Sequence, residues 1–498
     1  MRRIFTLFIA LCAVLFLFSG CQKDRIEKET EVYHTGKTAE NEASWHYGYG
    51  ASPIIAPSHK DGRGLYIAGY HNGWYSSGYL DRNTLKTYQN MDGRAAGEDP
   101  DYSQARAAWI DAGAGGILLI GIDCVGLSKT VTDQIRARLS PLCRENNCIF
   151  VNVYATHSHA SADTLGLWGP LAVDGKNDEY MQALVDAAVK AAEQAVKSRH
   201  TGQLRFGQTK TRGILFDSRD PQIYDPNLYQ LRFENGHGEK GLRLLFYGAH
   251  AESMRGDNTL LSRDFPGVMC DVVSYETGDD AMFLPGAIGG LIYTDILTEG
   301  DFHAAENMEL TGNALAEYAL SIAPSDEAVV SPELSAAKTR FTAKMDNTLY
   351  LYLRFLGVLT NEVVEGHSGS GYLVRSEMSV VRLGDVHIVC IPGEIFPELV
   401  FGGAYRSYGT GGKNPDPLLE IAAEYGVENM LIVGLCNDML GYIVPPSDFL
   451  VSEDAPYLEN VEDATGENHY EETNSLGPDT ARVIAKTLES LLAALEAQ

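Results

Sequence analysis

The stretch that decides the fold is Val151-Asn152-Val153-Tyr154-Ala155-Thr156-His157-Ser158-His159, a short apolar run that ends in two histidines one residue apart. In an extended strand, successive side chains point to opposite faces, so this spacing places both imidazoles on one side of the chain. Open α/β sheets bind their ligands outside the carboxyl ends of strands. The stretch therefore predicts a strand that carries two metal-binding imidazoles to a sheet edge. The alternative is a pair of loop histidines bonded to solvent or backbone.

Two further apolar runs end in side chains that bind metals well. Residues 242–247 lead into Gly248-Ala249-His250, and residues 386–391 lead into Pro392-Gly393-Glu394. Amphipathic segments alternate with such runs, and the clearest spans 177–199, with acidic residues in its first turn and basic residues in its last. Helices are also predicted over 128–139, 303–322, 417–425 and 478–497, and long strands over 333–354 and 378–389. This alternation predicts an α/β fold, a layered mixed sheet with flanking helices and a metal site at the strand ends.

The composition is that of a large globular protein with an acidic surface. The chain has 498 residues, 45% of them apolar, and a formal net charge of −28. Nucleic acids are held by clusters of Lys and Arg, which this charge balance disfavours, so we exclude a nucleic-acid partner. Cys143 and Cys148 are close enough in sequence to form a disulfide. No Cys-x-x-Cys pair occurs, which argues against a cysteine zinc cluster.

The first residues have the pattern of an export signal. Met1-Arg2-Arg3 is basic, residues 4–18 are apolar but too short for a comfortable bilayer span, and small residues precede Cys21. Ser19-Gly20-Cys21 resembles a bacterial lipobox, which implies cleavage before Cys21 and attachment of lipid to its thiol. The alternative is a plain secretory signal in which Cys21 is retained.

These features predict the organisation of the chain and its location. We expect residues 1–20 to be a lipoprotein signal peptide, 21–44 a flexible tether and 45–498 a single catalytic domain. A split near Pro332, where strand-like sequence becomes dense, is the alternative division. The expected location is the cell envelope, where the lipid at Cys21 would anchor the protein to the outer membrane. Exposure on the cell surface is one option within this prediction.

Three strand ends thus carry possible metal ligands: His157 with His159, His250, and Glu394. Two or three imidazoles plus one carboxylate on a rigid sheet edge suit Zn²⁺, with one coordination position left open for water. Zinc lowers the pKa of a bound water to about 7 and polarises a carbonyl oxygen, so such a site favours hydrolysis. Alone, each residue has an ordinary alternative, because Glu394 also suits a surface turn and His250 a hydrogen-bonded buried histidine.

Several blocks of the sequence resemble, in order and rough spacing, those of the neutral/alkaline, non-lysosomal ceramidases. The resemblance runs from about Gly69 to Pro478, and its most specific part is the Thr-His-x-His motif. The blocks are Ala155-Thr156-His157-Ser158-His159, Tyr247-Gly248-Ala249-His250, Ile391-Pro392-Gly393-Glu394, residues 437–449, and Tyr470-Glu471-Glu472-Thr473-Asn474-Ser475-Leu476-Gly477-Pro478.

The resemblance implies a zinc-dependent amidase that cuts the N-acyl bond of ceramide to give sphingosine and a fatty acid. By matching position, His157, His250, Glu394 and Tyr442 would be zinc ligands. It further implies that His159 lies beside the metal, that Arg219 holds a substrate oxygen, and that Tyr470 contacts the oxyanion or amide, as hydrogen-bond donors in such sites do. The implied partners are a lipid substrate and, through the N-terminal lipid, a membrane.

Two departures from the family pattern leave other readings open. Met439 stands where the family has a tyrosine, and residues 284–290 replace a polar block of the family. One alternative is a zinc hydrolase that acts on another N-acyl or ester substrate, because loops such as 71–81 and 165–174 vary freely on a fixed scaffold. A second alternative is a surface lipoprotein that binds lipid or glycan without catalysis.

Overall fold

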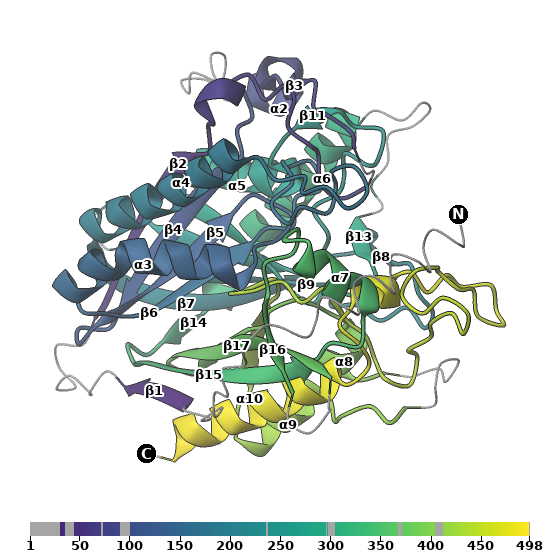
Figure 1. Ribbon diagram of the computed structural model, residues 1–498. Coiled ribbons are helices and arrows are strands. Elements are labelled where there is room, and N and C mark those ends of the chain that lie inside the picture. The colour runs from purple at the N-terminus through teal and green to yellow at the C-terminus, as the bar shows by residue number, and fades with distance from the viewer. Residues whose placement is uncertain are drawn as a thin grey trace.

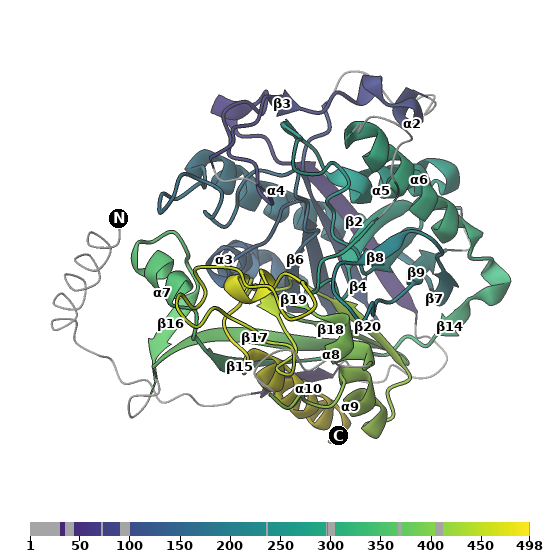
Figure 2. The ribbon, with the colours of Figure 1, turned by 90° about the vertical axis from the view of Figure 1, so that its right-hand side faces the viewer.

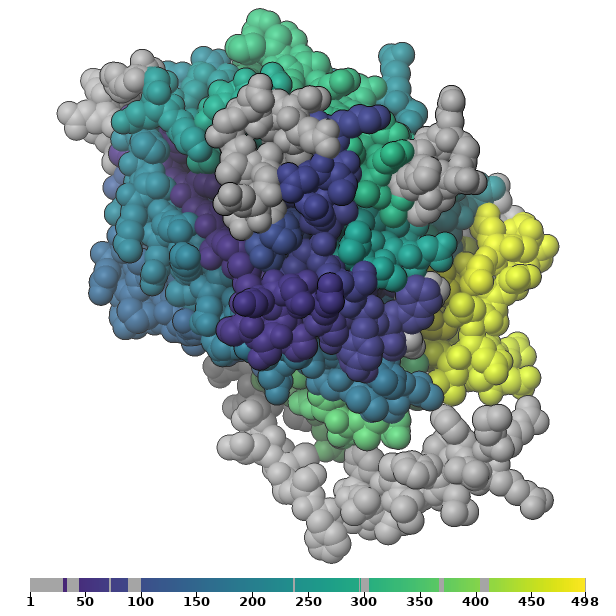
Figure 3. All heavy atoms as spheres, turned by 90° about the horizontal axis from the view of Figure 1, so that it is seen from above, coloured from purple at the N-terminus to yellow at the C-terminus, as the bar shows by residue number. Residues whose placement is uncertain are grey.

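Two β-sheets lie face to face at the centre of the molecule, with helices covering both outer faces (Figure 1). The computed structural model describes residues 30–34, 44–70, 73–89, 100–235, 238–294, 296, 304–366, 371–403 and 412–497. Seen from above, the purple and blue segments of the N-terminal third cover the middle of the surface, and yellow C-terminal residues lie at its right edge (Figure 3).

The larger sheet has nine strands, eight of them in the order β12-β10-β9-β7-β2-β4-β5-β6, with β14 paired to β7. The pairs β5–β6 and β10–β12 are parallel and the others are antiparallel, so the sheet is mixed. Its strands are β2 (Trp45–Pro53), β4 (Gln104–Asp111), β5 (Gly116–Ile122), β6 (Cys148–Ala155), β7 (His200–Lys210), β9 (Asn227–Glu234), β10 (Leu242–Tyr247), β12 (Asp280–Pro285) and β14 (Ala328–Val330).

The smaller sheet has six strands in the order β1-β15-β17-β18-β20, with β16 paired to β17. They are β1 (Thr30–His34), β15 (Leu334–Lys344), β16 (Glu362–Glu365), β17 (Tyr372–Leu383), β18 (Val386–Cys390) and β20 (Asn429–Val433). Short pairs of strands extend beyond the two sheets: β3 (Gly78–Tyr79) with β11 (Leu260–Leu261), β8 (Leu215–Asp217) with β13 (Ile292–Thr294), and β19 (Glu394–Ile395) with β21 (Tyr442–Ile443).

Helices form the two outer layers. The larger sheet is covered by α3 (Lys129–Glu145), α4 (Asp178–Lys197), α5 (Asp264–Thr277) and α6 (Ala304–Ser321), and the smaller sheet by α9 (Leu418–Glu424) and α10 (Thr480–Glu496). The short helices α2 (Lys86–Gln89), α7 (Thr348–Phe355) and α8 (Pro397–Phe401) lie in connections (Figure 2).

Alternation along the strands builds two cores from one sheet. On β10, Leu244 and Phe246 face the smaller sheet, whereas Leu245 and Tyr247 face α5 and α6. Because strand side chains alternate, strands buried on both faces read as continuous apolar runs, as β5 and β6 do. Burying these faces removes apolar surface from water, at roughly 25 cal/mol per Å². The core between the two sheets therefore holds their strand ends in fixed relative positions.

The predicted fold class is confirmed, with two sheets forming the layers. The amphipathic helix predicted over 177–199 is α4, and the Asn177 side chain caps it by accepting a hydrogen bond from the Tyr180 N–H at 2.9 Å. The strand predicted over 333–354 ends as β15 at Lys344, and residues 348–354 belong to α7 instead, because Asn347 accepts hydrogen bonds from two backbone N–H groups and starts a helix there. Among the described helices, none combines the length and apolarity required to cross a bilayer.

The structure describes one segment of the predicted tether. Thr30 to His34 forms β1 and pairs antiparallel with β15, which ties this segment to the edge of the smaller sheet. Cys21 and residues 1–29 lie outside the described residues, as do residues 35–43. The division into a signal peptide, a tether and one catalytic domain otherwise remains a prediction.

Candidate active site

The candidate site lies where the carboxyl ends of strands from both sheets meet. Backbone hydrogen bonds join the two sheets there: Asn437 N–H donates to Val153 O at 2.7 Å, and Gly434 N–H donates to Pro285 O at 3.0 Å. The strands that end at this junction include β6, β10, β18 and β20. This is the strand-end position that the sequence predicts, although the ends belong to two packed sheets.

The two histidines of the Thr-His-x-His motif follow β6. His157 has a φ of +66°, in the left-handed region, so the chain turns at this residue and is not extended as the spacing argument assumes. The turn nevertheless brings the two imidazoles together, with 3.1 Å between His157 Nε2 and His159 Nε2. Left-handed backbone in a non-glycine residue costs of order 1–3 kcal/mol and is often found at functional sites.

His250 and Glu394 complete the cluster. Glu394 Oε2 lies 3.1 Å from His250 Nε2 and 3.3 Å from His157 Nε2, and all three side chains are buried. Three imidazole nitrogens, from His157, His159 and His250, lie within 4.8 Å of one another. Residues far apart in the sequence therefore present nitrogen and oxygen donors to one point.

The hydrogen bonds behind the imidazoles orient them for a metal. His157 Nδ1 lies 2.6 Å from Val125 O, and His250 Nδ1 lies 3.0 Å from Ile292 O. A carbonyl oxygen can only accept, so both Nδ1 atoms donate a proton, and both Nε2 atoms are directed at Glu394. In the metal-free site Glu394 accepts from these Nε2 atoms, whereas a bound cation would take their lone pairs and the carboxylate together. The donor set thus fits a divalent metal, and histidine with carboxylate is a zinc-type combination.

The charges in the cluster follow from its burial. Burial alone would raise the pKa of Glu394, but His157 and His250 outweigh burial and hold that pKa well below its ordinary value. Burial and the two neighbouring imidazoles lower the pKa of His159 well below its ordinary value. Glu394 is therefore an anion and His159 a neutral base at neutral pH.

Two tyrosines stand beside the cluster. Tyr442 and Glu394 are register partners in the β21–β19 pair, and the Tyr442 hydroxyl lies 3.1 Å from the Tyr470 hydroxyl. Burial, followed by the charge of Glu394, raises the pKa of Tyr442, so its phenol keeps its proton in the metal-free site. Met439, at the family's first tyrosine position, packs with Leu165 and Val125 in an apolar wall.

Residues 284–290, which depart from the family pattern, position β19. Gly289 N–H donates to Ile395 O at 2.9 Å. A Cβ at Gly289 would lie 2.5 Å from Phe396 N, so only glycine allows this approach. The segment fixes the strand that carries Glu394.

Arg219 is placed behind the cavity wall and is not among the described residues that line the cavity. It follows β8, is buried, and its Nη2 donates to Glu472 Oε1 at 3.1 Å and to His469 Nδ1 at 2.5 Å. Asp448 and Glu471 lie 3.3 and 3.6 Å from the guanidinium. These contacts make Arg219 the centre of a buried ion network, and its predicted contact with a substrate oxygen stays a prediction.

Glu252 is the cavity residue that the sequence interpretation missed. Its carboxylate accepts a hydrogen bond from Tyr70, and Oε2 lies 3.5 Å from His159 Nδ1. His250-Ala251-Glu252 repeats the spacing of His157-Ser158-His159, and Ser158 pairs with Ala251 in a parallel bridge, so the two motifs lie side by side. A search for a second motif with i, i+2 spacing would have found it.

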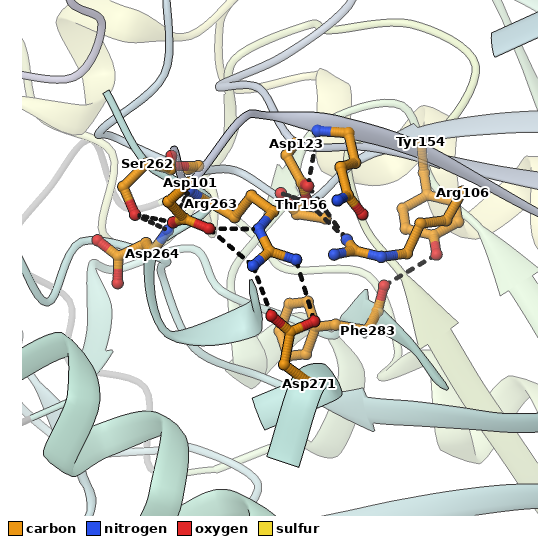
Figure 4. Close-up of polar contacts among 12 residues, drawn as sticks. Asp101, Arg106, Asp123, Tyr154, Thr156, Ser262, Arg263, Asp264, Asp271 and Phe283 are labelled. Atoms are coloured by element: carbon orange, nitrogen blue, oxygen red, sulfur yellow. Dashed lines mark hydrogen bonds and ion pairs between the residues drawn. The ribbon is translucent and has the colours of Figure 1, made fainter. Parts of the chain in front are cut away.

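A buried ion network contacts the histidine turn through Ser158, and Figure 4 shows its members Asp101, Ser262, Arg263 and Asp271. Ser158 Oγ donates to Ser262 O at 3.0 Å, and Ser262 Oγ donates to Asp101 Oδ2 at 2.6 Å. Arg263 then joins Asp101 to Asp271 through contacts of 2.7 Å to each carboxylate. Each side chain in this network is less than a fifth exposed, so the residues that hold the histidine turn are shielded from water.

A second ion pair in Figure 4 reaches the motif from the other side. Arg106 Nη1 lies 3.1 Å from both carboxylate oxygens of Asp123, and Thr156 Oγ1 donates to Asp123 Oδ1 at 3.3 Å. Thr156 directly precedes His157, which accounts for the threonine in the motif.

The cluster opens into a cavity of about 540 Å³. Loop 164–173, α7 and the residues after it form apolar walls, and His157, His159, Glu252, Glu394, Tyr442 and Tyr470 form the polar floor. Among the described lining residues there is no Lys or Arg. A cavity of this size with apolar walls and a few convergent polar groups is typical of a small-molecule site.

Comparisons with known proteins find relatives by sequence and by fold. No family model matches the chain. A neutral ceramidase of Pseudomonas aeruginosa is 26% identical over 183 residues, which cover 33% of this chain and 27% of that protein. The crystal structure of neutral ceramidase from Pseudomonas aeruginosa superposes with a TM-score of 0.67 at 16% identity, covering 92% of this chain and 75% of that one. A ceramidase complexed with C2 gives a TM-score of 0.66 at 15% identity, covering 92% and 76%.

The fold and the site define a layered α/β protein with a buried histidine–carboxylate cluster that suits a metal ion. Within that class, the chain has the fold of the neutral ceramidases, and the family resemblance predicted from its motifs is confirmed. The sequence match spans about a quarter of the curated relative, so the activity and substrate of that protein do not pass to this chain without a further argument.

Proposed function

We propose that the chain is a zinc-dependent hydrolase of an N-acyl amide bond, with ceramide as its preferred substrate. The observation that carries the proposal is the buried cluster of His157, His159, His250 and Glu394 at the floor of a cavity with apolar walls. His157, His250 and Glu394, with Tyr442, would hold the ion. Bound zinc supplies Lewis-acid activation of an acyl carbonyl and of water.

The side chains around the cluster suit the remaining steps of amide hydrolysis. His159, kept neutral by burial, would accept a proton from the attacking water and return it to the leaving amine. The Tyr470 hydroxyl would donate a hydrogen bond to the oxyanion that develops on the carbonyl oxygen. Glu252 would hold His159 through Nδ1, which leaves Nε2 directed at the reacting atoms. The apolar walls would hold the acyl chain.

The charges of the cavity favour one class of N-acyl substrate. Glu252 and Glu394 line the cavity, and no described lining residue is a Lys or Arg. An N-acyl amino acid would bring a carboxylate that finds no cation apart from the metal, and burying an unpaired charge is costly. The amide of a neutral amino alcohol, as in ceramide, meets no such penalty and offers hydroxyl donors to Glu252.

A hydrolase of another N-acyl or ester substrate is the second candidate, and Met439 is the observation that favours it. The thioether makes the wall apolar where the family pattern has a phenol, which removes one hydrogen-bonding group from the pocket. We also propose, from the sequence, that the protein is exported and attached to the outer membrane by lipid on Cys21, which would place it near membrane lipids.

Turnover and metal content test the proposal together. The purified full chain is incubated with a short-chain fluorescent ceramide, a matched N-acylglycine and a matched ester, while bound metal is quantified with and without a chelator. We expect about one zinc per chain, hydrolysis that a chelator abolishes, and faster hydrolysis of ceramide than of N-acylglycine. His157→Ala should lose both zinc and turnover, whereas His200→Ala, which changes a partly exposed histidine outside the site, should keep both.

Each other outcome selects a different reading. Zinc without ceramide hydrolysis, but with hydrolysis of the ester or another amide, would move the chain to the second candidate. Neither zinc nor turnover of any substrate would leave a lipid- or glycan-binding lipoprotein.

A further inference from the structure

Exposed apolar side chains gather around the mouth of the cavity. In the described part of the chain, twelve large apolar side chains are exposed, and eight of them lie on three short segments: Tyr70 with residues 73–75, residues 165–173, and α7 with the residue that follows it. The six most exposed of the eight, which we name the apolar rim, are Trp74, Tyr75, Leu171, Val173, Phe355 and Leu356.

The three segments form one continuous surface. Gly73 N–H donates to Trp168 O at 2.6 Å, which joins the first segment to the second. Leu167 packs with Leu353 and Val358, which joins the second segment to the third. The three segments therefore belong to one face of the molecule, while α6 and β14, which contain the exposed residues Leu310 and Val329, lie on the other side of the view from α7 (Figure 2).

The surface continues directly into the cavity. Leu171 and Val173 are 85% and 54% exposed and also line the cavity, and Leu353 and Val358 line it just below Phe355 and Leu356. An apolar chain could pass from outside to the cluster without leaving apolar contact. Scattered exposed apolar residues need no explanation, but a contiguous patch that leads into a binding cavity marks an interaction surface.

The charge of these segments differs from that of the rest of the chain. Residues 165–173 carry no charged side chain, and residues 348–358 carry only Arg354, in a protein of net charge −28. Arg354 Nε donates to Asn361 O at 2.6 Å, so even this cation is tied to the protein. A face that is poor in charged side chains and rich in Trp, Tyr, Phe and Leu has the composition of proteins that dock at a membrane interface.

We propose that the apolar rim docks on a zwitterionic lipid surface, so that an acyl chain slides from the lipid into the cavity without entering water. This inference rests on the proposed function for the identity of the substrate. Each methylene group lowers the equilibrium constant for transfer of an acyl chain from lipid to water about fourfold, so about ten methylenes lower it about a millionfold. Direct contact between rim and lipid removes that barrier, and the strongly acidic remainder of the protein disfavours an anionic surface.

Tryptophan quenching tests docking without requiring catalysis. The chain has four tryptophans; Trp45 and Trp109 are buried, while Trp74 is exposed and Trp168 lies beside it. Full-length protein is mixed with phosphatidylcholine vesicles whose acyl chains carry bromine, which quenches tryptophan at bilayer depth. We expect quenching that disappears in the double variant Trp74→Phe, Trp168→Phe. Vesicle binding through the N-terminal segment alone would leave the fluorescence unchanged, and that result would overturn the proposal.

Turnover of monomeric and of vesicle-bound substrate tests whether the rim delivers the acyl chain from lipid to the cavity. Phe355 and Leu356 belong to the rim but do not line the cavity. Phe355→Ser with Leu356→Ser should keep turnover of a monomeric short-chain substrate within about twofold and reduce turnover of a long-chain substrate in vesicles by about tenfold or more. Leu310→Ser with Val329→Ser, a pair of equally exposed apolar residues, serves as the control and should change neither.

The outcomes separate this inference from the proposed function. Quenching without hydrolysis of any substrate would support docking and refute the hydrolase. Hydrolysis with equal losses on monomeric and vesicular substrate would refute docking and keep the hydrolase. A dimer in solution that the Phe355 and Leu356 substitutions dissociate, with no quenching by vesicles, would show that the rim contacts a second copy of the chain and would overturn the lipid assignment.

Discussion

Replacing Arg263 by methionine should lower the free energy of unfolding by about 3–5 kcal/mol at pH 7, the usual effect of breaking a buried ion pair. The Arg263 side chain has no solvent exposure, and it contacts Asp101 and Asp271 at 2.7 Å each. Methionine fills similar space but leaves two buried carboxylates with less compensation. Arg82, whose Nη2 lies 3.1 Å from Asp101 and 3.7 Å from Asp271, remains in place, so we expect the lower half of the range.

The effect should depend on pH with a definite sign. Burial alone would raise the pKa of Asp271, but Arg263 outweighs burial and holds that pKa below its ordinary value; Asp101 behaves in the same way. A carboxylate with a depressed pKa stabilises the fold above its unfolded pKa, and that stability is lost as the pH falls through the folded pKa. Without Arg263 the folded pKa values rise, and protonation then relieves the uncompensated charge. The deficit of the variant should therefore be largest at pH 7 and shrink toward pH 5.

Urea unfolding followed by circular dichroism at both pH values measures the deficit. Adding Asp271→Asn to Arg263→Met removes one orphaned charge and should recover about 1–2 kcal/mol at pH 7. Arg138→Met, which breaks a largely exposed pair with Asp186, is the control and should cost less than about 1 kcal/mol. A deficit for Arg263→Met that is no larger than the control, or that the second substitution does not reduce, would refute the reasoning.

Three further predictions follow from the site. Gly69→Ala should reduce turnover at least about tenfold, because the new Cβ would lie 2.6 Å from His159 Cγ and displace that side chain. Gly73 also has a positive φ, but a Cβ there would meet nothing within 4 Å, so Gly73→Ala is the control and should have little effect. Glu471→Gln should raise the melting temperature more at pH 8.5 than at pH 5. Burial raises the pKa of Glu471 to about 7, so the stability that its protonated carboxyl contributes is lost as the pH rises through that value, and glutamine has no proton to lose. An equal change in melting temperature at both pH values would exclude this origin. Zinc held at about a thousand times its dissociation constant should stabilise the protein by about 4 kcal/mol over the chelated form, and coincident thermal melts would contradict a metal site in the core.

The residues of the cluster were predictable from sequence because His157, His250 and Glu394 each stand near the end of an apolar run. His157, His250 and Glu394 follow strands whose patterns are strong, and sheets bring strand ends together. The geometry of the His-x-His turn was not predictable, since tertiary contacts of Ser158 and Thr156 hold His157 at a positive φ that local propensity disfavours. The partners that supply those contacts are distant in sequence, so no local pattern reveals them.

Helix α7 and Arg219 are two further cases in which distant contacts, which local sequence does not reveal, decide the structure. Residues 348–355 contain aromatic and aliphatic side chains that suit a strand, yet the Asn347 cap and packing at the cavity wall make them helical. Arg219 has no local sign of its neighbours, because residues 448–472 approach it only in the folded chain. The family resemblance could suggest a role for Arg219, but the ion network around it emerges only from the structure.

The order of the cluster residues along the chain has a consequence for biogenesis. The cluster needs His157, which follows the larger sheet's edge strand, and Glu394, which follows a strand of the other sheet. A nascent or truncated chain that ends before residue 394 can present imidazoles but lacks the carboxylate that gathers them. The site thus assembles only after both sheets have been synthesised and packed, and metal occupancy should report completed folding during maturation.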